Sequence, residues 1–87
     1  MAINYDHVSV GTTATSIISS NTNAKVRKIE NVGSNTIFVG GANTVTTTNG
    51  FPIKVGETLN ISDYTGDIFG IVAASTEDAS YIEEDFQ

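Results

Sequence analysis

His7 is the single histidine of the chain, and it stands beside Asp6 in a segment whose pattern predicts a strand. Neighbouring residues in a strand point to opposite faces of the sheet, so these two side chains are poorly placed to share a proton. The chain has no cysteine, and none of its serines lies in a G-x-S-x-G segment. We therefore expect a protein that is not an enzyme and that binds no cofactor and no metal.

The segment "DYTGD" places Asp63, Thr65 and Asp67 at alternate positions, as a calcium loop does. A calcium loop also needs a further acidic ligand and a distant glutamate that binds through both oxygens, and these are missing. The segment instead predicts a capped turn, in which Asp63 accepts hydrogen bonds from nearby backbone N–H groups and Gly66 takes a positive φ angle.

The formal net charge is −6, and most of the acidic residues lie in the second half of the chain. A nucleic-acid-binding surface must neutralise several phosphates at once, so this balance argues against nucleic acid as a partner. No apolar run is long enough to cross a membrane. The N-terminal segment "MAINYDHVSV" lacks the basic residues and apolar run of a signal peptide, so we expect synthesis in a cytoplasm.

The 87 residues predict one domain over 1–87. A domain of this size gains only about 3–5 kcal/mol from its own core, and it often depends on disulfides, a metal or self-association. Because the chain has no cysteine and one histidine, self-association is the remaining source of stability.

The pattern of β-branched residues, with Gly or Asn every eight to twelve positions, predicts an all-β fold. We expect a small antiparallel β-sandwich, jelly-roll-like or barrel-like, with seven or eight short strands. The expected strands cover residues 4–10, 14–18, 25–31, 36–41, 53–55, 57–62, 68–75 and 79–83. An acidic C-terminal tail is expected to fray from about residue 84.

Four local features refine this prediction. Val26 and Ile29 are the expected core residues of 25–31, and their spacing of three calls for a β-bulge. Residues 31–41, "NVGSNTIFVGG", predict a hairpin. Leu59 and Ile61 alternate with polar residues and share one face. Gly70 lies in the apolar run 68–75, a predicted central strand, where it would admit a close neighbour.

Residues 40–52, "GGANTVTTTNGFP", carry no charge. A phosphate-binding loop would need a lysine and a following helix, and neither is present. Two interpretations remain: a hairpin tip that turns at Asn49–Gly50, or a loop that contacts another copy or another protein through Phe51 and Pro52. Phe51 could also close the open end of the sandwich.

The cations Lys25, Arg27 and Lys28 form the one basic cluster, with the first two on one strand face and Lys28 on the other. They predict either a salt bridge across the sheet or docking onto the acidic C-terminal segment of a neighbouring copy. That segment is either a solvated tail or a hook for a partner. The candidate protein-interface residues are Lys25, Arg27, Lys28, Phe51, Pro52, Ile53, Tyr81, Ile82 and Phe86.

The segments "VRKIENVGSNTIFVGG" and "GFPIKVGETLNISDYTGDIFGIVAAST" resemble small β-rich virion structural proteins of tailed bacteriophages. The shared pattern is a basic strand before "N-x-G-S-N-T", then "G-x-P-I-x-x-G-E-x-L-x-I-x-D-Y-T-G" and an apolar strand; it covers residues 27–40 and 50–73.

This resemblance implies a capsid decoration (cement) protein. Such a protein would self-associate, most often as a trimer, and dock on the major capsid protein at the virion surface. The alternative is a tail, collar or fibre module for attachment or for receptor or carbohydrate recognition.

Overall fold

Residues 2–85 are described by a computed structural model, and within this range the chain forms eight β-strands and no helix. The prediction of an all-β sandwich with seven or eight short strands is therefore confirmed. The strands are β1 (Ala2–Val10), β2 (Thr15–Ile18), β3 (Ala24–Asn31), β4 (Ile37–Gly40), β5 (Phe51–Ile53), β6 (Thr58–Ser62), β7 (Ile68–Ile71) and β8 (Glu77–Asp85).

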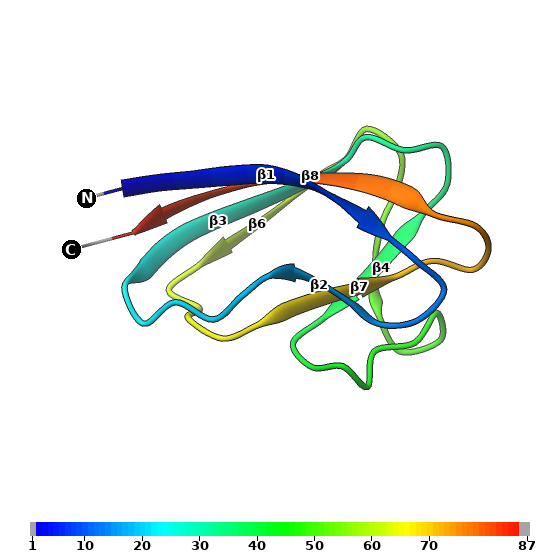
Figure 1. The fold of residues 1–87 in the computed structure, drawn as a ribbon, viewed down its shortest axis with the longest axis horizontal. Coiled ribbons are helices and arrows are strands. Elements are labelled where there is room, and N and C mark those ends of the chain that lie inside the picture. The colour runs from blue at the N-terminus through cyan, green and yellow to red at the C-terminus, as the bar shows by residue number, and fades with distance from the viewer. Residues whose placement is uncertain (1, 86–87) are drawn as a thin grey trace.

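The strands form two antiparallel sheets of four, with the order β1-β8-β3-β6 in sheet A and β2-β7-β4-β5 in sheet B. Every connection crosses from one sheet to the other except the one between β4 and β5. This is the topology of a jelly roll. Figure 1 shows the strands of sheet A fanned over those of sheet B, with the N-terminal and C-terminal strands side by side.

The core lies between the two sheets and consists of aliphatic side chains from both. Alternation along each strand decides which residues enter it: Leu59 and Ile61 of β6 face inward, as predicted, whereas Thr58, Asn60 and Ser62 are exposed. The buried members are Val10, Ile17, Ile18, Ile29, Ile37, Val39, Ile53, Ile68, Val72 and Ala79.

Gly70 lies at the centre of sheet B, in β7 between β2 and β4, as the apolar run predicted. A Cβ atom at this position would lie 2.6 Å from Cδ1 of Ile17 and 3.3 Å from Cγ1 of Val10. Glycine therefore leaves the space that Ile17 fills, and the predicted close approach is confirmed.

The predicted hairpin over 31–41 is wrong, because β3 and β4 lie in different sheets. Residues 32–36 instead cross between the sheets. The buried amide of Asn31 holds this crossing, since its Nδ2 donates to the carbonyl oxygens of Asn35 at 2.7 Å and Ile53 at 2.8 Å. A side chain thus takes over the main-chain contacts that a tight turn would make.

Residues 41–50 do connect a hairpin, since β4 pairs with β5, but the threonines lie in the loop and not in strands. Asn49 shapes the loop through its side chain, which accepts the N–H of Thr46 at 2.7 Å. The N–H of Gly50 donates to the carbonyl oxygen of Thr46 at 2.9 Å. The predicted two-residue turn at Asn49–Gly50 is therefore replaced by a longer loop closed by its own side chains.

Two smaller predictions also need correction. In "DYTGD" the left-handed residue is Asp63, with φ 61°, and not Gly66. β8 runs to Asp85, so the chain does not fray at residue 84. Asp85 is buried and accepts hydrogen bonds from three groups, which keeps the end of the strand in place.

Candidate interaction surfaces

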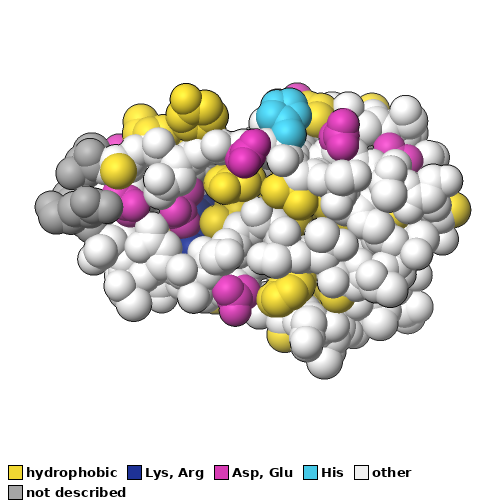
Figure 2. All heavy atoms as spheres, viewed as in Figure 1, with side chains coloured by type: hydrophobic (Ala, Val, Ile, Leu, Met, Phe, Trp, Pro, Cys, Tyr) yellow, Lys and Arg dark blue, Asp and Glu magenta, His cyan; other side chains and the backbone are white. Residues whose placement is uncertain are grey.

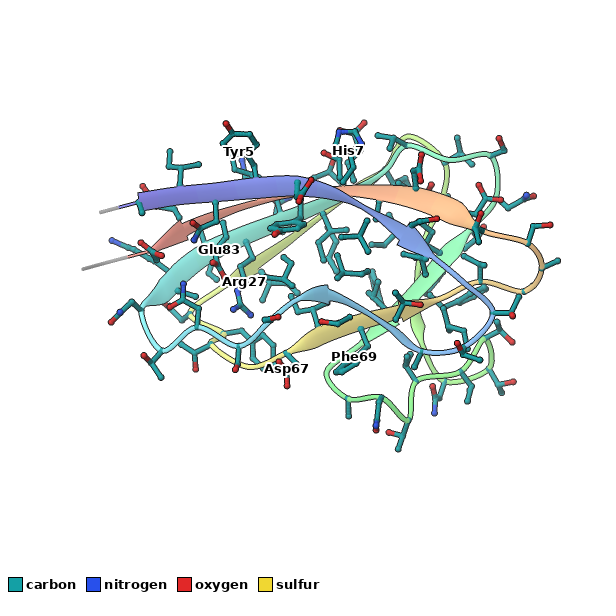
Figure 3. The ribbon with its side chains drawn as sticks, viewed as in Figure 1. Tyr5, His7, Arg27, Asp67, Phe69 and Glu83 are labelled. Carbon is teal, nitrogen blue, oxygen red and sulfur yellow. The ribbon has the colours of Figure 1, made fainter. Side chains whose placement is uncertain are left out.

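Arg27 points into the space between the sheets, where both it and Glu83 are buried (Figure 3). Its Nε lies 2.7 Å from Oε2 of Glu83 on the neighbouring strand β8. The guanidinium also donates to the carbonyl oxygens of Ser19 and Gly66, and it lies 5.7 Å from the ring centre of Tyr64. The predicted salt bridge across the sheet is thus confirmed for Arg27, which is not available for docking onto another copy.

The inward position of Arg27 corrects the prediction for β3. Arg27 and Ile29 alternate on the inner face, and Val26 lies half-buried on the outer face. A register shift between β3 and β8 does occur, but it lies between Ala24 and Val26, before the predicted place. The sequence pattern predicts Val26 as a core residue, whereas Arg27 occupies the core position.

The carboxylates of Glu83 and Asp85 share two amide donors. Nδ2 of Asn4 donates to Glu83 at 2.9 Å and to Asp85 at 3.1 Å, and Nδ2 of Asn21 donates to both at 3.0 Å. Burial alone would raise the pKa of Glu83, but the hydrogen bonds from Asn21, Asn4 and Arg27 outweigh it and lower the pKa. The Asn21 amide is the first cause of the lowered pKa of Asp85. This cluster ties β1 and the β2–β3 connection to β8.

Glu77 holds the opposite end of β8. It accepts the N–H of Ser34 at 2.6 Å and the side-chain amide of Asn35 at 2.8 Å. The hydrogen bond from Ser34 is the main reason that the pKa of Glu77 is lowered. Glu77, Asn4 and Asn21 were not singled out from the sequence, because each stands among polar neighbours that give it no distinguishing pattern.

Lys25 and Lys28 are exposed, so the predicted basic cluster is divided between the interior and the surface. Lys28 pairs with Ile82 on the outer face of sheet A, opposite to the face of Arg27. On β8, Ile82 is 44% exposed, whereas Tyr81 is partly buried against the core. Phe86 lies outside the described residues.

An apolar groove opens on the side of the sandwich where β5 and β6 are the edge strands. Its cavity has a volume of about 410 Å³. A second hollow of about 360 Å³ shares Phe51 and Leu59 with it and continues past Pro52. The lining residues of the first cavity, which we call the β5–β6 groove, are Val39, Gly40, Gly41, Phe51, Leu59, Ile61, Tyr64 and Ile68.

Phe51 lies at the rim of the β5–β6 groove and is 60% exposed, so it does not close the end of the sandwich. Pro52 is also exposed. Ile53 is only 2% exposed and belongs to the core, which removes it from the predicted surface contacts. Phe51 and Ile53 flank Pro52 and lie on the same face of β5, so the difference comes from what covers them: Ile53 packs within the core cluster, whereas Phe51 lines the open groove.

A second apolar area, which we call the outer patch, lies on the outer face of sheet A and consists of Ile3, Tyr5 and Ile82. These residues are 57%, 76% and 44% exposed. Tyr5 and Ile82 are direct partners across β1 and β8. Figure 3 shows Tyr5 projecting away from the sandwich, and Figure 2 shows hydrophobic side chains gathered at this surface.

The described residues hold no group of three His, Cys, Asp or Glu side chains placed to bind a metal ion. His7 is exposed, and the Asp6 carboxylate accepts its backbone N–H at 2.8 Å. Within residues 2–85, no helix could span a membrane. What the surface offers is apolar contact area on the groove and on the outer patch.

No protein-family model matches the chain, and no curated protein matches it. A solved structure is similar: a chain from work describing Bacillus endospore appendages as a family of disulfide-linked pili. The TM-score is 0.56 and the sequence identity 16%, over 98% of this chain and 89% of that one. At this level of identity the similarity concerns the fold alone. Disulfide linkage has no counterpart here, since the chain has no cysteine.

Proposed function

We propose that this chain is a non-enzymatic structural protein of a tailed-bacteriophage particle, a capsid decoration protein that self-associates and docks on the major capsid protein. The observation that carries the proposal is the β5–β6 groove with the exposed Phe51 at its rim. Exposed apolar areas rimmed by polar residues are typical of protein interfaces. The segments 27–40 and 50–73 resemble virion proteins, and this resemblance indicates a capsid protein as the partner.

The groove is suited to protein docking because the fold leaves it open. Leu59 and Ile61 face inward from β6, but no further strand of the described chain covers the gap between β6 and β5. Filling it with an apolar side chain from a partner would remove both surfaces from water at about 25 cal/mol per Å² of buried apolar area. Phe51 would act as the matching anchor on the rim, since aromatic residues often dominate binding energy.

Two measurements test the proposal. Light scattering coupled to size exclusion gives the oligomer mass, for which we expect a trimer. Co-sedimentation with DNA-free heads of the phage that encodes the protein gives the binding, for which we expect saturation at a fixed ratio to the major capsid protein. A protein that stays in the supernatant at every concentration would contradict the proposal.

A second candidate is a subunit of a tail, collar or fibre. The observation that favours it is the similarity in fold to a chain from the Bacillus endospore appendages, which are described as disulfide-linked pili. Electron microscopy of the concentrated protein separates the two candidates. Ordered filaments without added heads would favour the fibre subunit, and discrete particles that decorate heads would favour the capsid protein.

A further inference from the structure

The β1 edge of sheet A is open. β1 pairs with β8 along its whole length on one side, and within residues 2–85 no strand pairs with its other side. The N–H of His7 donates to the carboxylate of Asp6 and not to β8. Because main-chain groups alternate between the two sides of an antiparallel strand, Ile3 and Tyr5 present their N–H and C=O groups to the same free edge as His7.

The same stretch of β1 carries the outer patch. Tyr5 is the most exposed of the large hydrophobic residues, at 76%, and Ile3 is 57% exposed. Ile82 extends the patch onto β8 beside Tyr5. An edge that combines free main-chain groups with exposed aromatic and β-branched side chains is a template for another strand.

We propose that β1 pairs with β1 of a second copy, antiparallel and about a two-fold axis at Asn4, so that sheet A continues from one copy into the next. This inference rests on the proposed function, because it takes the chain to be a self-assembling subunit. The two-fold contact is separate from the contacts within the expected trimer and would join a subunit of one trimer to a subunit of another. The other edges fit this role less well. β6 presents the polar residues Thr58, Asn60 and Ser62 on its outer face, β5 has three residues and contains Pro52, and β2 has four.

The register follows from the faces of the strand. Residues of the same face must oppose each other if the sheet is to continue, so the two-fold axis passes through a single residue position. An axis at Asp6 would set two carboxylates opposite each other, which is destabilising. An axis at Tyr5 or at His7 would need the His7 N–H, which Asp6 already holds at 2.8 Å.

The axis at Asn4 avoids these conflicts. It sets Ile3 opposite Tyr5 of the second copy and Tyr5 opposite Ile3, and each of these pairs exchanges both main-chain hydrogen bonds. Aromatic and β-branched side chains opposite each other are a favourable cross-strand pair. The outer patches of the two copies then merge, and the Asp6–His7 contact marks where the pairing ends.

Cysteine cross-linking tests this register, because a disulfide forms only between residues that oppose each other. The chain has no cysteine of its own, so no other disulfide can form. Copies with Ile3→Cys are mixed with copies with Tyr5→Cys and oxidised mildly at high protein concentration. Opposed residues of a hydrogen-bonded pair have Cα atoms about 5.5 Å apart, within the range of a disulfide. In a pair of identical variants the two cysteines are offset by two residues along the paired strands, so their Cα atoms lie too far apart for a disulfide.

We expect disulfide-linked dimers in the mixture at about ten times or more the yield in either variant alone. Cross-linking of Tyr5→Cys with itself would place the axis at Tyr5 and overturn the register. Equal yields in the mixture and in the single variants, or no cross-link in any sample, would overturn the pairing.

A proline at position 5 tests the main-chain contact separately from the side chain. Tyr5→Pro removes an N–H that faces the free edge and leaves the bonds between β1 and β8 in place, and edge strands tolerate such a proline. Tyr5→Thr is the matched control, since it removes the aromatic ring and keeps the N–H. We expect Tyr5→Pro to remain folded and to weaken two-fold association at least tenfold, and Tyr5→Thr to weaken it less.

An equal effect of the two substitutions would mean that side-chain contact alone joins the copies, against the proposed strand pairing. Co-sedimentation with heads distinguishes the two proposals. If Tyr5→Pro binds heads as the natural sequence does, the decoration role stands whatever the result of cross-linking. If cross-linking succeeds and no variant binds heads, the strand pairing stands and the decoration role fails.

Discussion

Nε of Arg27 lies 2.7 Å from Oε2 of Glu83, and each of these two side chains is almost completely buried. A charge in the interior is tolerated only when its partner is present, because both have left water. The pair joins the central strands β3 and β8 of sheet A, at the end of the sandwich where the aliphatic core stops.

Arg27→Met leaves the carboxylate of Glu83 buried without its cation. We expect the free energy of unfolding to fall by about 3–5 kcal/mol, as is typical when one partner of a buried pair is removed. Urea unfolding followed by circular dichroism measures the change. Lys28→Met on the outer face of the same strand is the control, with an expected change within about 0.5 kcal/mol. Equal effects of the two substitutions would show that the pair does not stabilise the fold.

The lowered pKa values of Glu77, Glu83 and Asp85 predict a loss of stability in acid. Their ionised forms are favoured in the folded chain, so the stabilisation is fully present above the unfolded pKa values of about 4. It disappears as the pH falls through the lower folded pKa values. We expect the melting temperature to be level from pH 7 to about pH 5 and to fall below that.

Glu77→Gln isolates one of these groups. The variant should be less stable than the natural sequence at pH 7 and should approach it as the pH falls, because protonation removes the same charge from the natural protein. A constant difference in melting temperature from pH 7 to pH 2.5 would contradict the part assigned to this carboxylate.

Gly70→Ala should destabilise the protein by about 1–3 kcal/mol, the usual cost of overpacking a core. The added Cβ would lie 2.6 Å from Cδ1 of Ile17. Ile17→Val removes that Cδ1 atom, so the double variant should lose less stability than the sum of the two single variants. Gly11→Ala is the control, because its nearest neighbour would lie at an ordinary 3.9 Å. Additive effects of Gly70→Ala and Ile17→Val would show that the two residues do not compete for space.

The strand pattern of the sequence predicted much of this fold. Alternation placed Leu59 and Ile61 on one face of β6, and the first half of the apolar run 68–75 forms the central strand β7. The second half was predicted wrongly, since the strand ends at Ile71 and residues 73–75 are exposed. The correct predictions succeed because burial of one or both faces of a strand produces a recognisable pattern of apolar and polar residues in the sequence.

The inward side of β3 could not be predicted in the same way. Arg27 occupies a core position because Glu83, 56 positions further along the chain, meets it there. A local pattern contains no sign of such a partner, so Val26 was preferred as the core residue. The crossing after Asn31 was missed for a similar reason, since its amide binds a carbonyl on β5.

Of the predicted interface residues, Phe51, Pro52 and Ile82 lie at the surface, whereas Arg27 and Ile53 are buried. Ile3 and Tyr5 were missed, because their importance depends on β1 being an edge strand. The order of strands in a sheet is set by contacts between distant segments, so the sequence pattern of a single strand does not reveal which edge stays open.

Phe51→Ser should separate folding from docking. The side chain is 60% exposed, so its loss should change the free energy of unfolding by no more than about 0.5 kcal/mol. It lines the β5–β6 groove, and its loss should weaken binding to capsids by 1 kcal/mol or more, about fivefold, if it is an interface anchor. Val55→Ser is the matched control, since Val55 is 53% exposed and lies outside the groove.

Co-sedimentation of the natural protein, Phe51→Ser and Val55→Ser with DNA-free heads tests the central claim most directly. The decoration role predicts saturable binding of the natural protein and of Val55→Ser, with binding by Phe51→Ser at least about fivefold weaker. Failure of the natural protein to sediment with heads, at concentrations where it is folded and self-associated, would contradict the role as a capsid decoration protein.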